Sequence, residues 1–156
     1  MTGLFQYLRS PRTRLRLRNL FTRPVIYGII VNTVALSVYY FSAMNMGPHV
    51  FLVGLIGPFV TAVLSERDRE VIAAPTAGVV GAFLFFLVYL GYGATVASAY
   101  EYATATWVFA GFVAMTIAWS FLLLGGFFMF GIILGWLVWY AKGYWKRRQR
   151  SLSSGQ

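Results

Sequence analysis

The stretch ERDREVIAAPTAGVVGAFLFFLVYLGYGA, residues 66–94, decides the fold class of this chain. It opens with five charged residues in a row, Glu66 to Glu70, and residues 75–94 then carry no charge at all. Twenty residues of apolar helix extend about 30 Å, which is the thickness of the hydrocarbon core of a bilayer. Because a run of charges is costly in hydrocarbon, we expect 66–70 in a water-exposed turn and 75–94 in a membrane span.

The composition of the whole chain agrees with a membrane protein. Of its 156 residues, 59% are hydrophobic and 11% are charged, whereas an average soluble domain has about 25% charged residues. The mean hydropathy is +0.69. There is no cysteine, which excludes disulfides, thiolate metal sites and cysteine nucleophiles. The first apolar span follows an arginine-rich stretch and is longer than a signal-peptide core, so we expect it to be retained.

Three further spans are predicted, at residues 25–43, 48–65 and 107–141. Pro58 lies inside the second of these and predicts a kink, since proline removes one helical hydrogen bond. The 35 residues of 107–141 would extend about 52 Å as a helix, more than one upright crossing needs. Gly125 and Gly126 are the predicted weak point. One long helix, bent at this pair, is favoured over two short crossings, which would move the basic C-terminus to the other side. Whether the helix is continuous or broken at Gly125 and Gly126 is left open by the sequence.

The distribution of basic residues tests this count of spans. With four crossings, all thirteen arginines and lysines fall on one side of the membrane, as the positive-inside rule requires. The predicted fold is therefore an all-α integral membrane bundle of four transmembrane helices, with both termini on the cytoplasmic or virion-interior side. Its parts are a basic segment at 1–24, a transmembrane domain at 25–141 and a basic tail at 142–156.

The two basic ends predict contact with anionic lipid headgroups. Residues 1–24 have the pattern of an amphipathic interfacial helix, although a disordered basic tail fits equally well. Nucleic acid is a possible partner only through non-specific phosphate contacts. The candidate lipid- or anion-contacting residues are Arg12, Arg14, Arg16, Arg18, Arg23, Lys146, Arg147 and Arg148.

The sequence offers little for catalysis or transport. His49 is the only histidine, and at the outer membrane edge it is expected to act as a polar cap. No ionisable residue lies well within any predicted span, whereas transport pathways usually contain one. Asn32 is the strongest polar group inside a span, and we expect it to form a hydrogen bond between helices. No cofactor, metal site or enzymatic activity is predicted.

Small residues occur at spacings that favour close helix packing. Gly131 and Gly135 form a G-x-x-x-G pattern in the last span. We favour packing inside one four-helix bundle over self-association. The other candidates for helix packing, besides Asn32, are Gly54, Gly57, Gly78 and Gly81.

The chain resembles the small four-span membrane proteins of haloarchaea and of pleomorphic haloarchaeal viruses. The resemblance is carried by SERDRE at 65–70 leading into AAPTAGVVG at 73–81, and by the glycine-rich last span. It implies a cell membrane or a viral envelope as the location. It is a resemblance of architecture, and it assigns no functional residue.

These observations favour a non-catalytic structural or accessory membrane protein. It would scaffold a membrane or a membrane complex through helix packing and a basic cytoplasmic face, with other membrane subunits or copies of itself as partners. The alternative is a homo-oligomeric pore, such as a holin-like protein or a small-solute channel, assembled through the G-x-x-x-G face.

Overall fold

The computed structural model describes residues 22–43, 49–66 and 69–153. This part of the chain is helical, which confirms the predicted all-α class for the described residues. The predicted interfacial segment with Arg12, Arg14, Arg16 and Arg18 lies outside them. The elements are α3 (Arg23–Ala43), α4 (Val50–Gly54), α5 (Ile56–Leu64), α6 (Glu70–Ala97) and α7 (Tyr102–Ser153).

Three helices, α3, α6 and the Tyr102–Lys146 part of α7, are long and apolar enough to cross a membrane. They coincide with three of the four predicted spans and indicate a multi-pass membrane protein. Between them, the apolar segment Val50–Leu64 is shorter than a usual membrane-spanning helix.

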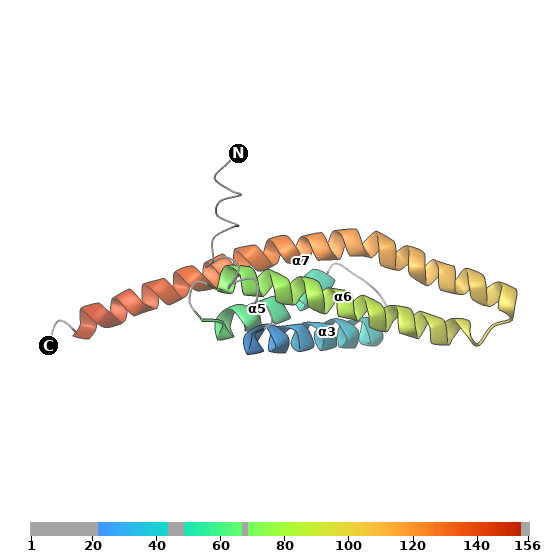
Figure 1. The fold of residues 1–156 in the computed structure, drawn as a ribbon, viewed down its shortest axis with the longest axis horizontal. Coiled ribbons are helices and arrows are strands. Elements are labelled where there is room, and N and C mark those ends of the chain that lie inside the picture. The colour runs from blue at the N-terminus through green and yellow to red at the C-terminus, as the bar shows by residue number, and fades with distance from the viewer. Residues whose placement is uncertain (1–21, 44–48, 67–68, 154–156) are drawn as a thin grey trace, which may run out of the picture.

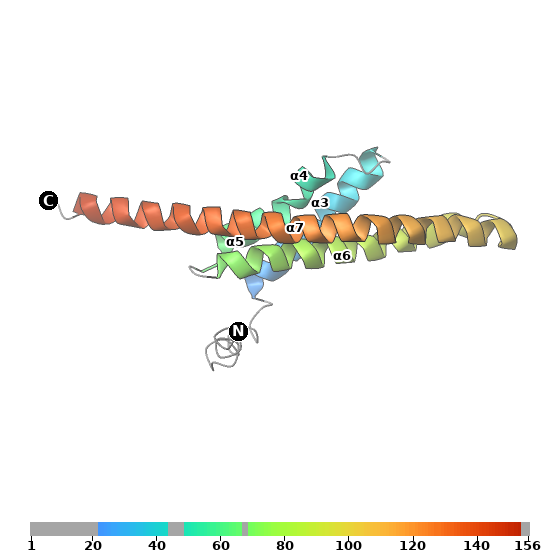
Figure 2. The same cartoon turned by 90° about the horizontal axis from the view of Figure 1, so that it is seen from above.

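The long helices α6 and α7 form an antiparallel hairpin, which is closed by the link at residues 98–101 (Figure 1). This pair makes the largest interface in the described part of the chain. Helix α3 crosses the hairpin obliquely, as seen from above in Figure 2. The start of α3, the end of α5 and the start of α6 lie near one another, and α7 runs on beyond them toward its C-terminal end (Figure 1).

The predicted second span, 48–65, is divided into α4 and α5 at Leu55. Pro58 has no N–H to donate to the carbonyl of Gly54, and its ring would clash with that carbonyl in a regular helix. The Leu55 amide donates to the carbonyl of Leu52, three residues back and not four. This bond tightens the end of α4. The interruption therefore lies three residues before Pro58 itself.

Helix α7 continues through Gly125 and Gly126 without interruption (Figure 1). The single long helix that the sequence favoured is therefore present, and the helix break considered at this glycine pair does not occur. Glycine weakens a helix by about 1 kcal/mol relative to alanine. Breaking a helix in hydrocarbon would leave backbone groups without hydrogen-bond partners, at several kcal/mol each. The second cost exceeds the first, so the helix stays continuous.

Helix α6 begins before the predicted third span. Helix α6 starts at Glu70 and contains Pro75 inside it, whereas the span was expected to begin near Pro75. Charge alone suggested that Glu70 faces water, but this side chain is fully buried. The reason is a partner on α7, described below.

The core beside the C-terminal half of α3 is rich in aromatic rings. Phe85, Phe127 and Leu36 are fully buried there. Tyr40 and Tyr89 pack edge to face, with ring centroids 5.1 Å apart, a favourable geometry for aromatic pairs. This cluster joins α3 and α4 to the hairpin.

Candidate functional site: polar contacts between the helices

Asn32 is fully buried on α3, at the crossing with α5 and α6. Its Nδ2 donates a hydrogen bond of 3.1 Å to the carbonyl of Gly78 on α6. The hydroxyl of the neighbouring Thr33 lies 3.1 Å from the carbonyl of Gly81 and 2.9 Å from the carbonyl of Ile29 on its own helix, so its one hydrogen is shared between the two. Both bonds join α3 to α6 within the apolar part of the molecule, where such bonds contribute about 0.6 kcal/mol each.

Glycines allow this crossing to be close. A β-carbon on Gly57 would lie 2.5 Å from the carbonyl oxygen of Gly28, and one on Gly81 would lie 2.7 Å from the Cβ of Asn32. Both distances are shorter than van der Waals contact. Thr61 of α5 also reaches α3. Its hydroxyl lies 3.3 Å from the carbonyl of Pro24 and 3.0 Å from the carbonyl of Gly57 on its own helix, so its one hydrogen is shared between the two.

The G-x-x-x-G pattern of α7 faces α6. A β-carbon on Gly131 would lie 2.5 Å from the Cα of Pro75, and one on Gly135 would lie 2.6 Å from the carbonyl oxygen of Glu70. This face is therefore occupied inside the molecule. The remaining candidates also lie against other helices, with Gly54 against the Phe127 ring and Gly78 against Pro58.

Lys142 and Glu70 form an ion pair at the end of the molecule where α5 ends and α6 begins. The Lys142 Nζ lies 3.1 Å from Oε1 of Glu70. It also donates to the carbonyls of Ala62, at 3.0 Å, and Ser65, at 2.7 Å. These carbonyls belong to the last turn of α5, where a helix leaves acceptors unsatisfied and attracts cations. One ammonium group thus holds α5, α6 and α7 together.

The surroundings of this pair explain its geometry. Glu70 is 0% exposed and the Lys142 side chain is 32% exposed. Glu70 also lies in the first turn of α6, where the helix dipole favours a negative charge. Within the described residues, its second oxygen Oε2, the Ser65 hydroxyl and the Asn32 Oδ1 are buried without a hydrogen-bond partner.

Sequence reasoning missed this pair. Glu70 was assigned to a water-exposed turn and Lys142 to the basic tail. The feature that could have suggested the pair was the predicted four-span topology, because it places Glu70 and Lys142 at the same membrane face. Their separation of 72 residues gives no local pattern that could link them.

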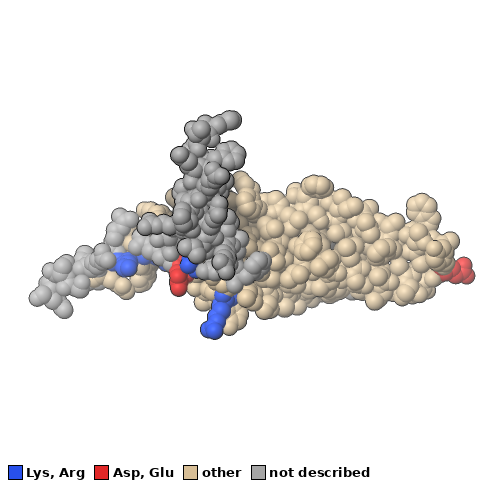
Figure 3. Space-filling view, viewed as in Figure 1, with Lys and Arg blue, Asp and Glu red and all other residues tan. Residues whose placement is uncertain are grey.

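The other charges of the described residues lie at the two ends of the molecule. The exposed charged residues where α3 and α6 begin are Arg23, Glu66, Arg69, Lys146 and Arg148. Glu101 precedes α7 at the hairpin end. In this view, coloured charged atoms lie at the hairpin tip and around the start of α6 and the C-terminal part of α7, and the surface between these two regions is uncharged (Figure 3). Arg147 lies in the last turns of α7.

His49 is exposed at the N-terminal end of α4 and caps it without a side-chain hydrogen bond. Across residues 22–43, 49–66 and 69–153, no three His, Cys, Asp or Glu side chains form a group that could hold a metal ion. The site is therefore described best by its helix-to-helix contacts.

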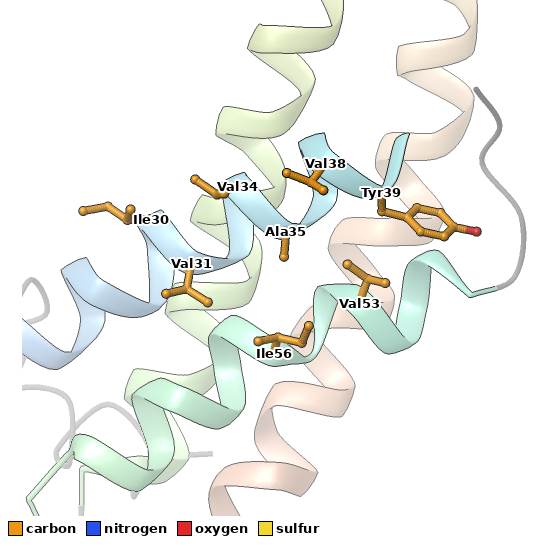
Figure 4. A pocket seen from close by; sticks show the side chains of 8 residues that line it. All are labelled: Ile30, Val31, Val34, Ala35, Val38, Tyr39, Val53 and Ile56. Carbon is orange, nitrogen blue, oxygen red and sulfur yellow. The ribbon is translucent and has the colours of Figure 1, made fainter. Parts of the chain in front are cut away.

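A shallow groove of about 600 Å³ separates α3 from α4 and α5 (Figure 4). The Tyr39 ring extends away from the other lining side chains in this view. The groove presents apolar groups to its surroundings. Its lining residues are Ile30, Val31, Val34, Ala35, Val38, Tyr39, Val53 and Ile56.

In comparisons with protein-family models, curated proteins and solved structures, nothing matches this chain.

Proposed function

We propose that this chain crosses a membrane four times, with both termini on the cytoplasmic or virion-interior side. Helix α3 leads away from the end that carries Arg23, and α6 starts again at that end (Figure 1). The segment α4–α5 must therefore return, and it forms the second crossing. The exposed cations Arg23, Arg69 and Lys146 share this end, which supports its assignment to the inner side by the positive-inside rule.

The chain acts as a non-catalytic structural or accessory membrane subunit. The observation that carries this proposal is that its buried polar side chains bond to neighbouring helices. Asn32, Thr33 and Thr61 hydrogen-bond to the backbone of other helices, and Lys142 joins three helices at once. These groups hold a bundle together, which is what a scaffold requires.

Helix α7 supplies the surface for partners within the membrane. Large apolar side chains such as Ile117, Phe121 and Ile133 are exposed along it. Larger subunits or further copies of the chain pack against this helix, and the basic end contacts anionic lipid. The resemblance to small haloarchaeal and viral membrane proteins fits a membrane or envelope scaffold of this kind.

Gentle extraction from the native membrane tests the accessory role. The native mass is measured, and co-purifying chains are identified by mass spectrometry. A fixed set of larger companions is the expected result. A ring containing only copies of this chain would contradict the accessory role and favour the pore.

The pore remains the rival because α4 and α5 are interrupted at Leu55, and broken helices occur in ion and solute pathways. Liposomes that contain the purified protein and a trapped small dye separate the two functions. We expect no dye release above that of protein-free vesicles. Rapid release at a low protein-to-lipid ratio would establish the pore.

The basic N-terminal segment gives a further prediction. Replacing Arg12, Arg14, Arg16 and Arg18 with Gln should weaken binding of a peptide of residues 1–24 to anionic vesicles by about 1 kcal/mol per residue. Vesicle co-sedimentation measures this, and neutral vesicles are the control. Unchanged affinity would show that the segment does not bind the headgroups.

A further inference from the structure

The continuous α7 helix creates a mismatch of lengths between the helices. Residues 107–141 carry no charge and lie in one unbroken helix, so their apolar length is about 52 Å. Helix α3 has 21 residues and is about 31 Å long. The hydrocarbon core of a bilayer is about 30 Å thick. An upright α3 therefore fits the membrane, while an upright α7 exceeds it by about 20 Å.

The Lys142 contacts fix one end of α7 relative to the membrane. Its ammonium group lies at the level of Ser65 and Glu70, next to the exposed Glu66 and Arg69. Such charges require water or headgroups. The excess length of α7 therefore lies at the hairpin end, beyond the far face of the membrane if the helix is upright.

An upright hairpin would expose apolar side chains to water. Met115, Ile117 and Phe121 are all more than half exposed on the surface of the molecule, and they would lie at or beyond the far membrane face. A tilted hairpin keeps them in hydrocarbon, where exposure to lipid is favourable. Tilting is also the usual response of a helix that is longer than the bilayer is thick.

The crossing of the helices allows this tilt. Helix α3 runs obliquely to the α6–α7 pair (Figure 2), and Gly57 and Gly81 let them approach closely at Asn32. Tilting the hairpin thus brings α3 toward the membrane normal. In this arrangement the short α3 and the long α7 both match the thickness of one bilayer. If the two helices were parallel, they could not both match it.

We propose that the α6–α7 hairpin crosses the membrane strongly tilted away from the membrane normal, while α3 stands close to the normal. Fitting 52 Å of apolar helix into 30–40 Å of hydrocarbon and inner headgroup region requires a tilt of roughly 40° to 55°. The inference rests on the proposed membrane insertion but not on the accessory role.

Exposed alanines on α7 provide the test. Ala114 and Ala118 are exposed on one face of the helix, and they lie about 42 and 36 Å along the axis from Lys142. Because the chain has no cysteine, Ala114→Cys and Ala118→Cys can each carry a single spin label. The purified variants are placed in bilayers with 18-carbon chains, and the accessibility of each label to oxygen and to a water-soluble nickel chelate is measured.

We expect both labels to be accessible to oxygen and inaccessible to the nickel chelate, as sites in hydrocarbon are. Labels accessible to nickel would mean that the hairpin projects into water and would overturn the proposal. Labels at Ala43→Cys and Ala141→Cys, near the two membrane faces, show separately whether the chain is inserted.

A second measurement needs no substitution. Polarised infrared dichroism of the unmodified protein gives the mean helix tilt in bilayers with chains of 14, 18 and 22 carbons. The tilt should decrease as the bilayer thickens. A tilt that is small in every bilayer, or that does not change with thickness, contradicts the proposal whatever the labels report.

Discussion

Lys142 donates three hydrogen bonds, to Ala62, Ser65 and Glu70, which is as many hydrogens as its ammonium group carries. The lysine is therefore fully satisfied without water, and Glu70 has a counter-charge although it is buried. A buried ion pair adds little to stability compared with apolar residues, but the loss of one partner leaves the other charge uncompensated.

Replacing Lys142 with Met should lower the free energy of unfolding by about 3 kcal/mol, because the Glu70 carboxylate is left buried and alone. The double variant Glu70→Gln with Lys142→Met should recover part of that loss, about 1–2 kcal/mol. Unfolding in mixed micelles measures both, and Lys146→Met is the control for loss of charge. Equal effects of Lys142→Met and Lys146→Met would show that the pair has no structural role.

The glycines at the helix crossing differ from those that face outward. Gly81→Ala should lower the free energy of unfolding by about 2 kcal/mol, because the new methyl group meets Asn32. Gly125 has no atom within 4 Å of a potential β-carbon, so Gly125→Ala should leave stability unchanged or raise it by up to about 1 kcal/mol. The same unfolding assay compares the two, and equal losses would contradict the close crossing.

At the scale of the helices, hydropathy and length predicted most of the fold. The apolar runs from 25, 75 and 107 predicted α3, α6 and α7, because charge-free stretches of this length have few alternatives in a membrane. Helices α6 and α7 extend beyond the predicted spans for a physical reason. Glu70 is buried by a distant partner, and the charged residues after Ala141 continue the helix beyond the apolar core.

For the candidate site, the sequence predicted the kind of contact that a residue makes, but not the residue with which it makes that contact. Asn32 was expected to bond across helices, but nothing local shows that its acceptor is the carbonyl of Gly78, 46 residues away. The Thr33 and Ser65 contacts were missed for the same reason. Which helices touch is decided by tertiary packing, and a single sequence carries no direct record of it.

The interruption between α4 and α5 can be tested through Pro58. In Pro58→Ala, the new amide can donate to the Gly54 carbonyl, so α4 and α5 should join into one helix. Hydrogen exchange in residues 55–59 should slow about fivefold, as a regained bond of about 1 kcal/mol implies. Pro75→Ala is the control, because α6 is already continuous there, and faster exchange in Pro58→Ala would argue against this cause.

At the scale of the whole molecule, the charges define two ends separated by an apolar belt. The end with Arg23, Arg69 and Lys146 is basic, and the hairpin end carries Glu101. The exposed aromatic residues Tyr100, Tyr102 and Trp107 lie toward the hairpin end, and Tyr140, Tyr144 and Trp145 toward the basic end. Such aromatic residues favour the membrane interface, so both faces of the membrane are marked.

Cysteine labelling in intact cells tests the orientation. Ser98→Cys, at the hairpin end, should react with a membrane-impermeant maleimide added outside, and Gln149→Cys should react only after the cells are permeabilised. The unmodified chain is the control, since it has no cysteine. The reverse labelling pattern would place the basic end outside and contradict the positive-inside assignment.

The ion pair also has a consequence for biosynthesis. Glu70 is made at the start of α6, whereas Lys142 is made 72 residues later, in the C-terminal part of α7. A ribosome-bound chain that stops before Lys142 holds an uncompensated carboxylate at the start of α6. The Glu70–Lys142 pair therefore forms only after most of α7 has been made, and until then the Glu70 carboxylate lacks this counter-charge.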